Sequence, residues 1–294
     1  SPTKLRGGYY TDAGISHFLT RWVFEIQPKR VLEPSCGDGA FFEAMSQVSN
    51  NSLEQVVGFE IEKNEAAKAE QRSAMCLPGK TEIHNQDFLG WAYKSFASGV
   101  TFDGVLGNPP YIRYQYLDEK LQRIAEGIFK YLRLPFTKHT NMWVTFVVAC
   151  LALLRSKGRL AMVLPAELLH VLHAQPLRNY LARECERILV VDPNELWFEG
   201  SLQGAILLLA EKKENRDSHS RGLGIVQTTS RVFLDSNVNR LFASAEYLNG
   251  ETIEGKWVKA LLNKEEREVF ADACQRNDTH QFDSLADVDV GIVT

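Results

Sequence analysis

The sequence predicts an α/β fold built on a doubly wound, mostly parallel sheet of seven strands. Short apolar runs alternate with longer helical patterns between residues 15 and 210, as in strands joined by crossover helices. The runs are almost continuously apolar, so both faces of the sheet should be covered. Four of them are followed by polar or aromatic residues, which should meet along the carboxyl edge of the sheet.

The expected elements come in a regular order. The strands lie at residues 31–35, 55–60, 81–84, 102–107, 159–165, 187–191 and 205–210. The helices lie at residues 15–25, 40–48, 62–70, 142–154 and 176–186. The apolar helix at 142–154 is too short to span a bilayer and is typical of a buried helix.

The segment Asn108-Pro109-Pro110-Tyr111 directly follows the fourth strand. Two prolines stiffen this loop and leave its carbonyls free as acceptors. Together with the Asn108 amide and the Tyr111 ring, they could grip a flat molecule that carries an amino group. The competing interpretation is an ordinary proline turn with a tyrosine on the surface.

A glycine turn follows the first strand. Gly37 and Gly39 would bring the backbone close to a ligand at a helix N-terminus. Glu60 ends the second run 23 residues after Gly37, an offset at which an acid reaches ribose hydroxyls in a doubly wound sheet. Asp87 and Phe88 follow the third run. Glu60 could instead be a surface acid, and Asp87 could cap the next helix.

The ordered set of motifs resembles the class I S-adenosylmethionine-dependent methyltransferases. It is most similar to the DNA adenine-N6 methyltransferases of the gamma arrangement, which include restriction-modification enzymes. The resemblance covers roughly residues 4–212. The matching motifs are Gly7-Gly8-Tyr9-Tyr10-Thr11, Glu33-Pro34-Ser35-Cys36-Gly37-Asp38-Gly39, Glu60, Asp87-Phe88, Asn108-Pro109-Pro110-Tyr111 and Asn194-Glu195-Leu196-Trp197-Phe198-Glu199-Gly200.

The resemblance implies a fold, a cofactor and a set of site residues. The seventh strand would be antiparallel and inserted between the fifth and the sixth. The catalytic residues would be Asn108, Pro109, Pro110 and Tyr111, and the ring of Phe198 would stack with Tyr111 on the target base. S-adenosylmethionine would be bound without a metal by Thr11, Glu33, Pro34, Cys36, Gly37, Gly39, Glu60, Ile61, Asp87 and Phe88.

Three of these residues have simpler alternatives. Thr11 could only cap the helix at residue 15, Glu33 could only satisfy the glycine turn, and Phe198 could belong to the core. Cys36 has no evident base beside it, so we interpret it as a small packing residue.

The chemistry of an adenine amine agrees with this loop. The N6 lone pair is shared with the ring, which makes the amine a poor nucleophile. If Asn108 Oδ1 and the Pro109 carbonyl each accept one N6–H, the lone pair can turn toward the methyl group of a sulfonium cofactor. A duplex base reaches such a pocket only when it flips out of the stack.

Composition indicates a cytoplasmic enzyme. The chain has 294 residues, 45% hydrophobic content, a net charge of −4 and five cysteines without a CxxC pair. Residues 111–140 carry six Lys/Arg against three Asp/Glu, interleaved with aromatic residues. This stretch could contact double-stranded DNA or form a lid, and it could also be an ordinary amphipathic helix.

We expect a catalytic domain at residues 1–212 and a C-terminal extension at 213–294. Residues 251–294 hold ten Asp/Glu against five Lys/Arg, so they are a poor DNA-binding face. In the resembled family a separate target-recognition domain follows. We therefore expect a shortened form of a longer protein, or a half that needs a partner.

Other functions remain open at this point. A protein glutamine-N5 methyltransferase or an RNA guanine-N2 methyltransferase could use the same loop on another planar amine. The chain could also be an inactive, cofactor-binding half. A nicotinamide dehydrogenase fits less well, because Phe42 replaces the third glycine of its fingerprint.

Overall fold

The computed structural model describes residues 11–48, 51–193, 204–215, 217–228, 231–248 and 256–276, together with His280 and Leu285. Phe198 and the rest of the Asn194–Gly200 motif lie outside the described residues, as do Gly7, Gly8, Tyr9 and Tyr10.

The described residues form a mixed sheet of nine strands in the order β3-β2-β1-β4-β5-β7-β6-β8-β9. The strands are β1 (Arg30–Glu33), β2 (Gln55–Phe59), β3 (Thr81–His84), β4 (Phe102–Gly107), β5 (Leu154–Pro165), β6 (Cys185–Pro193), β7 (Ala205–Lys212), β8 (Gly222–Thr228) and β9 (Tyr247–Leu248). β7 runs antiparallel between β5 and β6. The predicted fold class and the antiparallel insertion are therefore confirmed.

The sheet has two strands more than the seven predicted. β8 pairs in parallel with β6, and the two-residue β9 pairs with the start of β8. β8 has the sequence GLGIVQT, whose glycines and polar end interrupt the apolar run that identified the other strands. Both strands follow the boundary predicted at residue 212, and that domain division stays a prediction.

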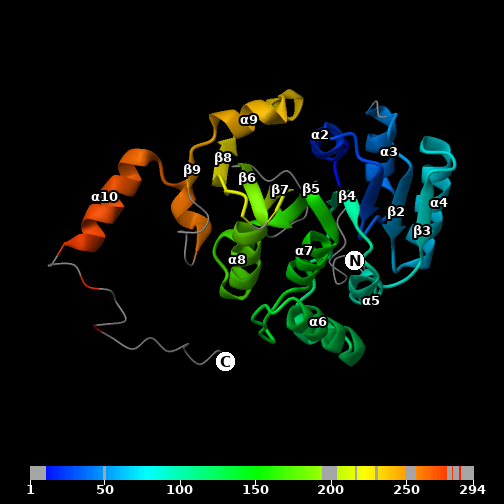
Figure 1. Cartoon of the computed structure of the whole chain (residues 1–294), viewed down its shortest axis with the longest axis horizontal. Coiled ribbons are helices and arrows are strands. Elements are labelled where there is room, and N and C mark those ends of the chain that lie inside the picture. Colours follow the sequence, from blue (N-terminus) through cyan, green and yellow to red (C-terminus); the bar gives the residue numbers. More distant parts are fainter. Residues whose placement is uncertain are drawn as a thin grey trace.

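Helices cover both faces of the sheet (Figure 1). One face carries α2 (Ala13–Phe24), α3 (Ala40–Gln47), α4 (Lys63–Cys76) and α9 (Val238–Ser244). The other carries α5 (Phe88–Ser95), α6 (Glu119–Tyr131), α7 (Met142–Leu153) and α8 (Gln175–Glu184). Two apolar cores result, one on each face, as the continuous strand patterns predicted. Farther along the chain, α10 (Lys264–Gln275) has no buried residue.

Sequence explains the character of these helices. α7 is apolar all round and is buried on nearly every side, whereas α6 is strongly amphipathic and lies outside α5 and α7. α2 packs flush against the sheet because Gly104 has no side chain: a Cβ there would lie 2.5 Å from Val23 Cγ1. None of the helices in the described part of the chain has both the length and the apolar character that crossing a membrane requires.

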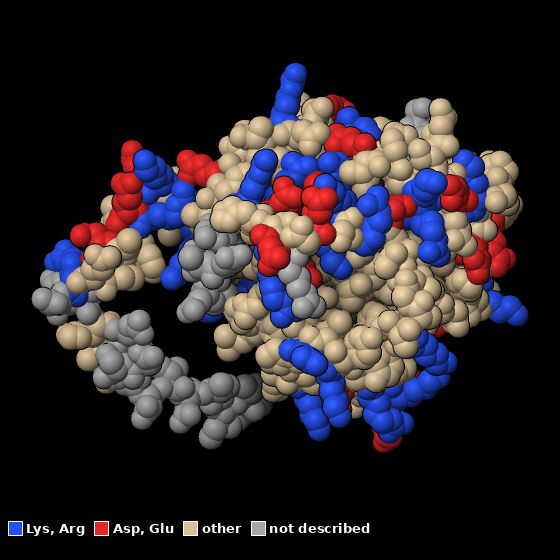
Figure 2. Space-filling view, viewed as in Figure 1, with Lys and Arg blue, Asp and Glu red and all other residues tan. Residues whose placement is uncertain are grey.

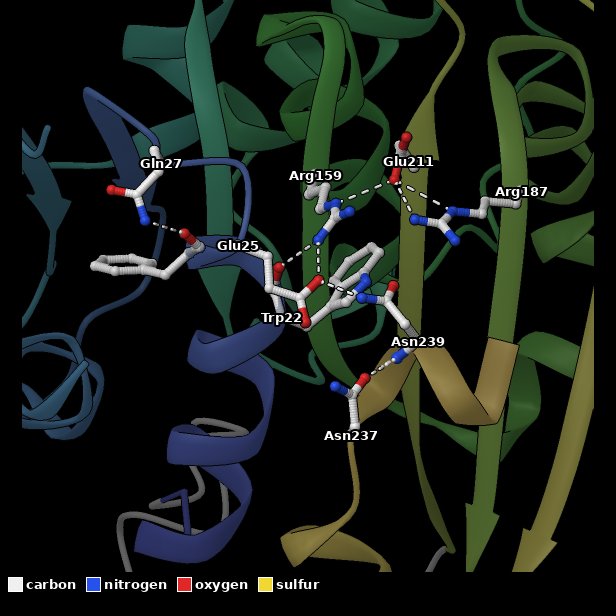
Figure 3. Close-up of polar contacts among 9 residues, drawn as sticks. Trp22, Glu25, Gln27, Arg159, Arg187, Glu211, Asn237 and Asn239 are labelled. Carbon is white, nitrogen blue, oxygen red and sulfur yellow. Dashed lines mark hydrogen bonds and ion pairs between the residues drawn. The ribbon is translucent and has the colours of Figure 1, made fainter. Parts of the chain in front are cut away.

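A largely buried ion-pair network joins α2 to the sheet around Arg159 of β5 (Figure 3). The Arg159 guanidinium donates to Glu25 Oε2 at 2.8 Å, to Glu211 Oε2 at 3.0 Å and to the Trp22 carbonyl at 2.6 Å. Arg187 donates to the same Glu211 oxygen at 2.7 Å. Each of these charges has a partner, so the network fixes α2, β5, β6 and β7 relative to one another. We call this set of residues the Arg159 network.

Candidate active site

The predicted catalytic loop lies at the carboxyl end of β4, between β1 and β5. Asn108 is held from two sides: its Nδ2 donates to Thr11 Oγ1 at 3.4 Å, and its Oδ1 accepts from the Tyr111 hydroxyl at 3.0 Å. The Tyr111 hydroxyl also lies 3.1 Å from the Val163 carbonyl of β5. These contacts bring Thr11 and Tyr111 to Asn108, although Thr11 is 97 residues away in sequence.

The glycine turn lies directly beside this loop. The Ser35 hydroxyl donates to the Asn108 carbonyl at 3.0 Å, and Pro34 is buried against Gly107, where a Cβ would lie 3.1 Å from Pro34 Cδ. The turn from β1 into α3 is therefore bonded to the loop that follows β4.

Glycine is required at two positions of the turn. Gly37 and Gly39 adopt φ of 53° and 91°, in the left-handed region. Nothing lies within 4 Å of a Cβ built at Gly37, so the space beside it is open, whereas at Gly39 such an atom would lie 2.9 Å from Phe42 Cδ2. Gly39 also serves as the N-cap of α3, whose N-terminus thus opens toward the turn.

Glu60 closes the turn from the second strand. Its Oε2 accepts from the Gly37 backbone N–H at 3.0 Å, and its Oε1 accepts from the Glu62 N–H at 2.8 Å. Burial raises the pKa of this carboxyl against the opposing effect of these hydrogen bonds. The next residue, Ile61, is 62% exposed and gives an apolar surface that could cover a planar ring.

Glu33 is a buried carboxyl at the end of β1 with only 1% of its surface exposed. Its Oε2 has no hydrogen-bond partner among the described residues. Burial raises the pKa of Glu33 well above its usual value, and the nearby carboxylates of Asp38 and Glu60 raise it further. An unsatisfied buried carboxyl among other acids is a site where a cation would be stabilised.

Two predicted residues have other roles in the geometry. Asp87 caps α5 by accepting from the backbone N–H groups of Leu89 at 3.2 Å and Gly90 at 2.6 Å. Phe88 is 2% exposed and packs against Phe59 and Phe146 with ring centroids 5.4 Å and 5.2 Å apart. The cap agrees with the simpler interpretation of Asp87, and a contact of either residue with adenine stays a prediction.

Cys36 is 4% exposed, and burial raises the pKa of its thiol far above the usual range. Its backbone N–H donates to the Phe59 carbonyl at 2.8 Å, which ties the turn to β2. The residue therefore packs the turn, as its sequence context indicated.

The sequence interpretation missed several residues of this site. Ser35 and the Val163 carbonyl bond the catalytic loop, as described above. Asn85 donates from Nδ2 to the carbonyls of Glu60 and Ile61 at 2.9 and 3.1 Å, and its place after the third strand was a usable signal. Asn141 precedes α7, its Oδ1 is buried without a partner among the described residues, and the neighbouring Met142 N–H bonds the Ile112 carbonyl at 2.8 Å.

Two cavities accompany these elements. One of about 190 Å³ is lined by Thr11, Asp38, Arg72 and residues of α3, beside the glycine turn. A larger one of about 370 Å³ lies between α2 and the start of α9 and contains none of the predicted site residues. Among the residues that the structure describes, no three His, Cys, Asp or Glu side chains are grouped so as to hold a metal ion.

The strand order, the glycine turn and the loop after β4 define a Rossmann-like methyltransferase fold. Comparison with known proteins then identifies the family. Residues 1–288 match the family model described as N-6 DNA Methylase, and the chain belongs to this family.

Curated relatives support the same family. The chain is 31% identical over 182 residues to the type II methyltransferase M.TthHB8I of Thermus thermophilus, covering 60% of this chain and 39% of the relative. It is 24% identical over 204 residues to the type II methyltransferase M.AccI of Acinetobacter calcoaceticus, covering 68% and 36%. The chain thus spans less than half the length of these relatives.

Among solved structures, the DrdV–DNA complex has the same fold. The TM-score is 0.66 at 14% identity, over 90% of this chain and 32% of that chain. At this identity, the likeness establishes the fold alone.

Proposed function

We propose that this chain transfers a methyl group from S-adenosylmethionine to the N6 amine of a flipped-out adenine in DNA. One observation carries the proposal: the Asn108 amide is fixed between Thr11 and Tyr111 at the carboxyl end of β4, next to the glycine turn. Membership of the N-6 DNA Methylase family supports it. Among the structural relatives, DrdV was solved bound to DNA.

The residues around the glycine turn fit the cofactor. The unpartnered Glu33 Oε2 is an acceptor for the ammonium of its methionine part, and the adjacent open space at Gly37 admits it. Glu60 carries acceptor lone pairs for the ribose hydroxyls beyond those used by Gly37 and Glu62. Ile61 and Asp87 would contact the adenine end. The cofactor supplies an electrophilic methyl group on a sulfonium.

The catalytic loop would hold the amine that receives this methyl. Asn108 Oδ1 has two lone pairs, so it can accept an N6–H while it keeps the Tyr111 hydroxyl. The Pro109 carbonyl would accept the second N6–H. Both bonds would draw the amine toward tetrahedral geometry. Its lone pair could then form the new N–C bond as the methyl–sulfur bond breaks, with S-adenosylhomocysteine as the leaving group and one N6 proton lost to solvent. Orientation therefore replaces a general base in this mechanism.

The target base would be held by stacking. The Tyr111 ring is half-buried beside Asn108, and Phe198 would provide the second face. Stacking of this kind contributes about 1–3 kcal/mol per base. Exposed Lys and Arg side chains gather over α6 and the segment after it, at the lower edge of Figure 2. These side chains would meet the phosphates of a duplex.

The experiment that tests the proposal is transfer of a tritiated methyl group from S-adenosylmethionine. The purified protein is offered duplex DNA of random sequence, structured RNA and a glutamine-bearing release-factor protein, and the labelled product is hydrolysed and identified. We expect N6-methyladenine from DNA alone. Label on guanine N2 or on glutamine would contradict the proposal, and cofactor binding without transfer to any of the three substrates would identify an inactive half.

A further inference from the structure

The loop at residues 166–174, between β5 and α8, lies beside the proposed target-base site. β5 is the neighbour of β4 on one side and of β7 on the other. The Tyr111 hydroxyl lies 3.1 Å from Val163 O, two residues before the end of β5. On the other side, Ala166 N donates to Gly204 O at 2.9 Å, and Gly204 follows Phe198 by six residues in sequence. The loop therefore leaves the sheet at the strand whose Val163 carbonyl lies against Tyr111, and its first residue is bonded to Gly204.

A buried guanidinium braces this loop from beneath. Arg178 of α8 is 1% exposed and donates to the carbonyls of Leu168 at 2.9 Å and Val171 at 3.0 Å, and to Gln175 Oε1 at 2.6 Å. Burial lowers the pKa of Arg178 to about 10, which shows the cost of removing this cation from water. Because these charge-assisted hydrogen bonds go to loop carbonyls, the loop is held in one conformation.

An apolar side chain stands at the tip of the braced loop. Leu172 is 79% exposed, more than any other large hydrophobic side chain in the part of the chain that the structure describes. A rigid loop that presents a leucine to water gains nothing in the free protein. A preformed apolar tip is instead suited to enter an apolar space in a partner.

The place of the loop next to Val163 and Tyr111 favours duplex DNA as that partner, because the proposed function puts the target base against Tyr111. His170 is exposed, and Lys138 and His139 are exposed in the segment before α7. Burial lowers the pKa of His173, nearby Glu167 opposes this effect, and the charges of His139 and Arg178 lower it further. His139 is thus close enough to affect His173, and the charged residues near the loop include the acid Glu167 as well as the buried Arg178.

On the basis of the proposed function, we propose that Leu172 is a wedge that enters the base stack of duplex DNA where the target adenine leaves it. Flipping leaves a gap between two base pairs, and its apolar faces become exposed to water. Leucine is one of the side chains that fill such spaces in bent or opened duplexes. The hydrogen bonds from Arg178 already order the loop in the free protein, so binding would not carry the entropy cost of ordering it.

The test compares Leu172→Ala with Met75→Ala, which removes a side chain that is 71% exposed on α4, far along the sheet from this loop. Once the methylated sequence of genomic DNA is known, each purified protein is given a paired duplex and a duplex with a mismatch opposite the target adenine. We expect Leu172→Ala to lower turnover on the paired duplex at least about fivefold and to leave the mismatched duplex within about twofold, because a mismatched base is already easier to extrude. Leu172→Phe should keep most of the activity, and Met75→Ala should match the unaltered protein on both duplexes.

Other outcomes overturn the inference. Equal activity of Leu172→Ala and the unaltered protein on both duplexes would show that the tip does not enter the stack. An equal loss on both would show that Leu172 contacts protein or supports the fold, and thermal unfolding of the variant separates these two causes. If the unaltered protein itself methylates no adenine in any DNA, the proposed function fails first, and that result is distinct because it is measured before any variant.

Discussion

Polar groups around Arg159 of β5 and polar groups at the carboxyl edge of the sheet are held in opposite ways. At Arg159, each charge of the Arg159 network has a partner within 3.2 Å, and the bonds join α2 to β5, β6 and β7 (Figure 3). At the carboxyl edge of the sheet, Glu33 Oε2 and Asn141 Oδ1 are buried without partners among the described residues. A fold has no stability reason to leave such atoms unsatisfied. The difference is between paired charges that stabilise the protein and unsatisfied oxygens beside the loop that we propose to bind ligands.

The largest effect on activity is expected for Asn108→Ala, at the carboxyl edge of the sheet. Loss of an oriented acceptor should lower methyl transfer at least about 100-fold and leave the free energy of unfolding and cofactor affinity nearly unchanged. Turnover on DNA, calorimetry with S-adenosylhomocysteine and thermal unfolding measure the three quantities. Asn51→Ala, at an exposed turn before β2, is the matched control. A variant that keeps more than about a tenth of the activity would contradict the assignment.

Arg159→Met should have the reverse effect. It leaves Glu25 without its cation and should cost about 2–3 kcal/mol of unfolding free energy, less than the loss for a fully buried pair because Glu25 is 33% exposed. Urea unfolding checks the value, and turnover of the folded fraction should change little. Arg123→Ala, which breaks an exposed pair with Glu119 on α6, should cost well under about 1 kcal/mol. If Arg159→Met inactivated the folded protein, the Arg159 network would have a role in activity as well as in stability.

Glu60→Ala tests whether the glycine turn at the carboxyl edge of the sheet binds the cofactor. The carboxylate both braces Gly37 and is proposed to bind the ribose, so its loss should weaken binding of S-adenosylmethionine by about 1.5–3 kcal/mol. Isothermal titration gives the affinity. Glu70→Ala, on the exposed side of α4, should leave it unchanged. Unaltered affinity in Glu60→Ala would remove this residue from the cofactor site.

Glu33→Gln should show that the buried Glu33 carboxylate lowers the stability of the free protein. Because the pKa of Glu33 is raised in the folded protein, the folded state binds more protons than the unfolded state above about pH 4.5, and stability falls as pH rises through that range. Glutamine removes this dependence. We therefore expect a higher melting temperature than the unaltered protein at pH 7 and weaker binding of S-adenosylmethionine. A variant that is less stable at pH 7 would show that the carboxylate is satisfied in the free protein.

The smallest effect is expected at the basic side chains of α6. Lys120→Ala and Lys130→Ala should each weaken DNA binding modestly and reduce the slope of log K against log salt by about one, whatever the sequence of the duplex. Binding titrations at several salt concentrations measure the slope. Lys63→Ala, an exposed lysine on α4, should leave it unchanged. A change that depends on DNA sequence would mean that α6 reads bases.

The sequence predicted most of the sheet because its strands are apolar runs with polar ends. It predicted the glycine turn, Glu60 and the loop at Asn108 for the same reason: each follows a strand, and parallel strands bring their carboxyl ends to one edge. β8 was missed because two glycines weaken its pattern, and β9 because two residues carry no period. The place of the antiparallel β7 came from the family resemblance, since pairing order is not written in the pattern of a single strand.

Most of the contacts that hold the site could not be predicted from the sequence. Ser35 and Asn108 are 73 residues apart, and Tyr111 and Val163 are 52 apart, so these bonds follow from packing and not from any local motif. The partners of Arg159 were equally hidden, because charges on three separate elements converge only after folding. Unsatisfied atoms such as Glu33 Oε2 can be recognised only when the neighbours are known.

The pairing of β8 with β6 also bears on where the chain can be shortened. β6 is buried from Ile188 to Val191, and β8 satisfies the backbone groups along its outer side. A protein ended at residue 212 would present that apolar strand as an open edge, which is a template for pairing with another copy. The short β9 limits the same hazard on β8, since it covers Leu223 and Gly224. Preparations of the catalytic region should therefore retain residues up to at least Leu248 if they are to resist aggregation.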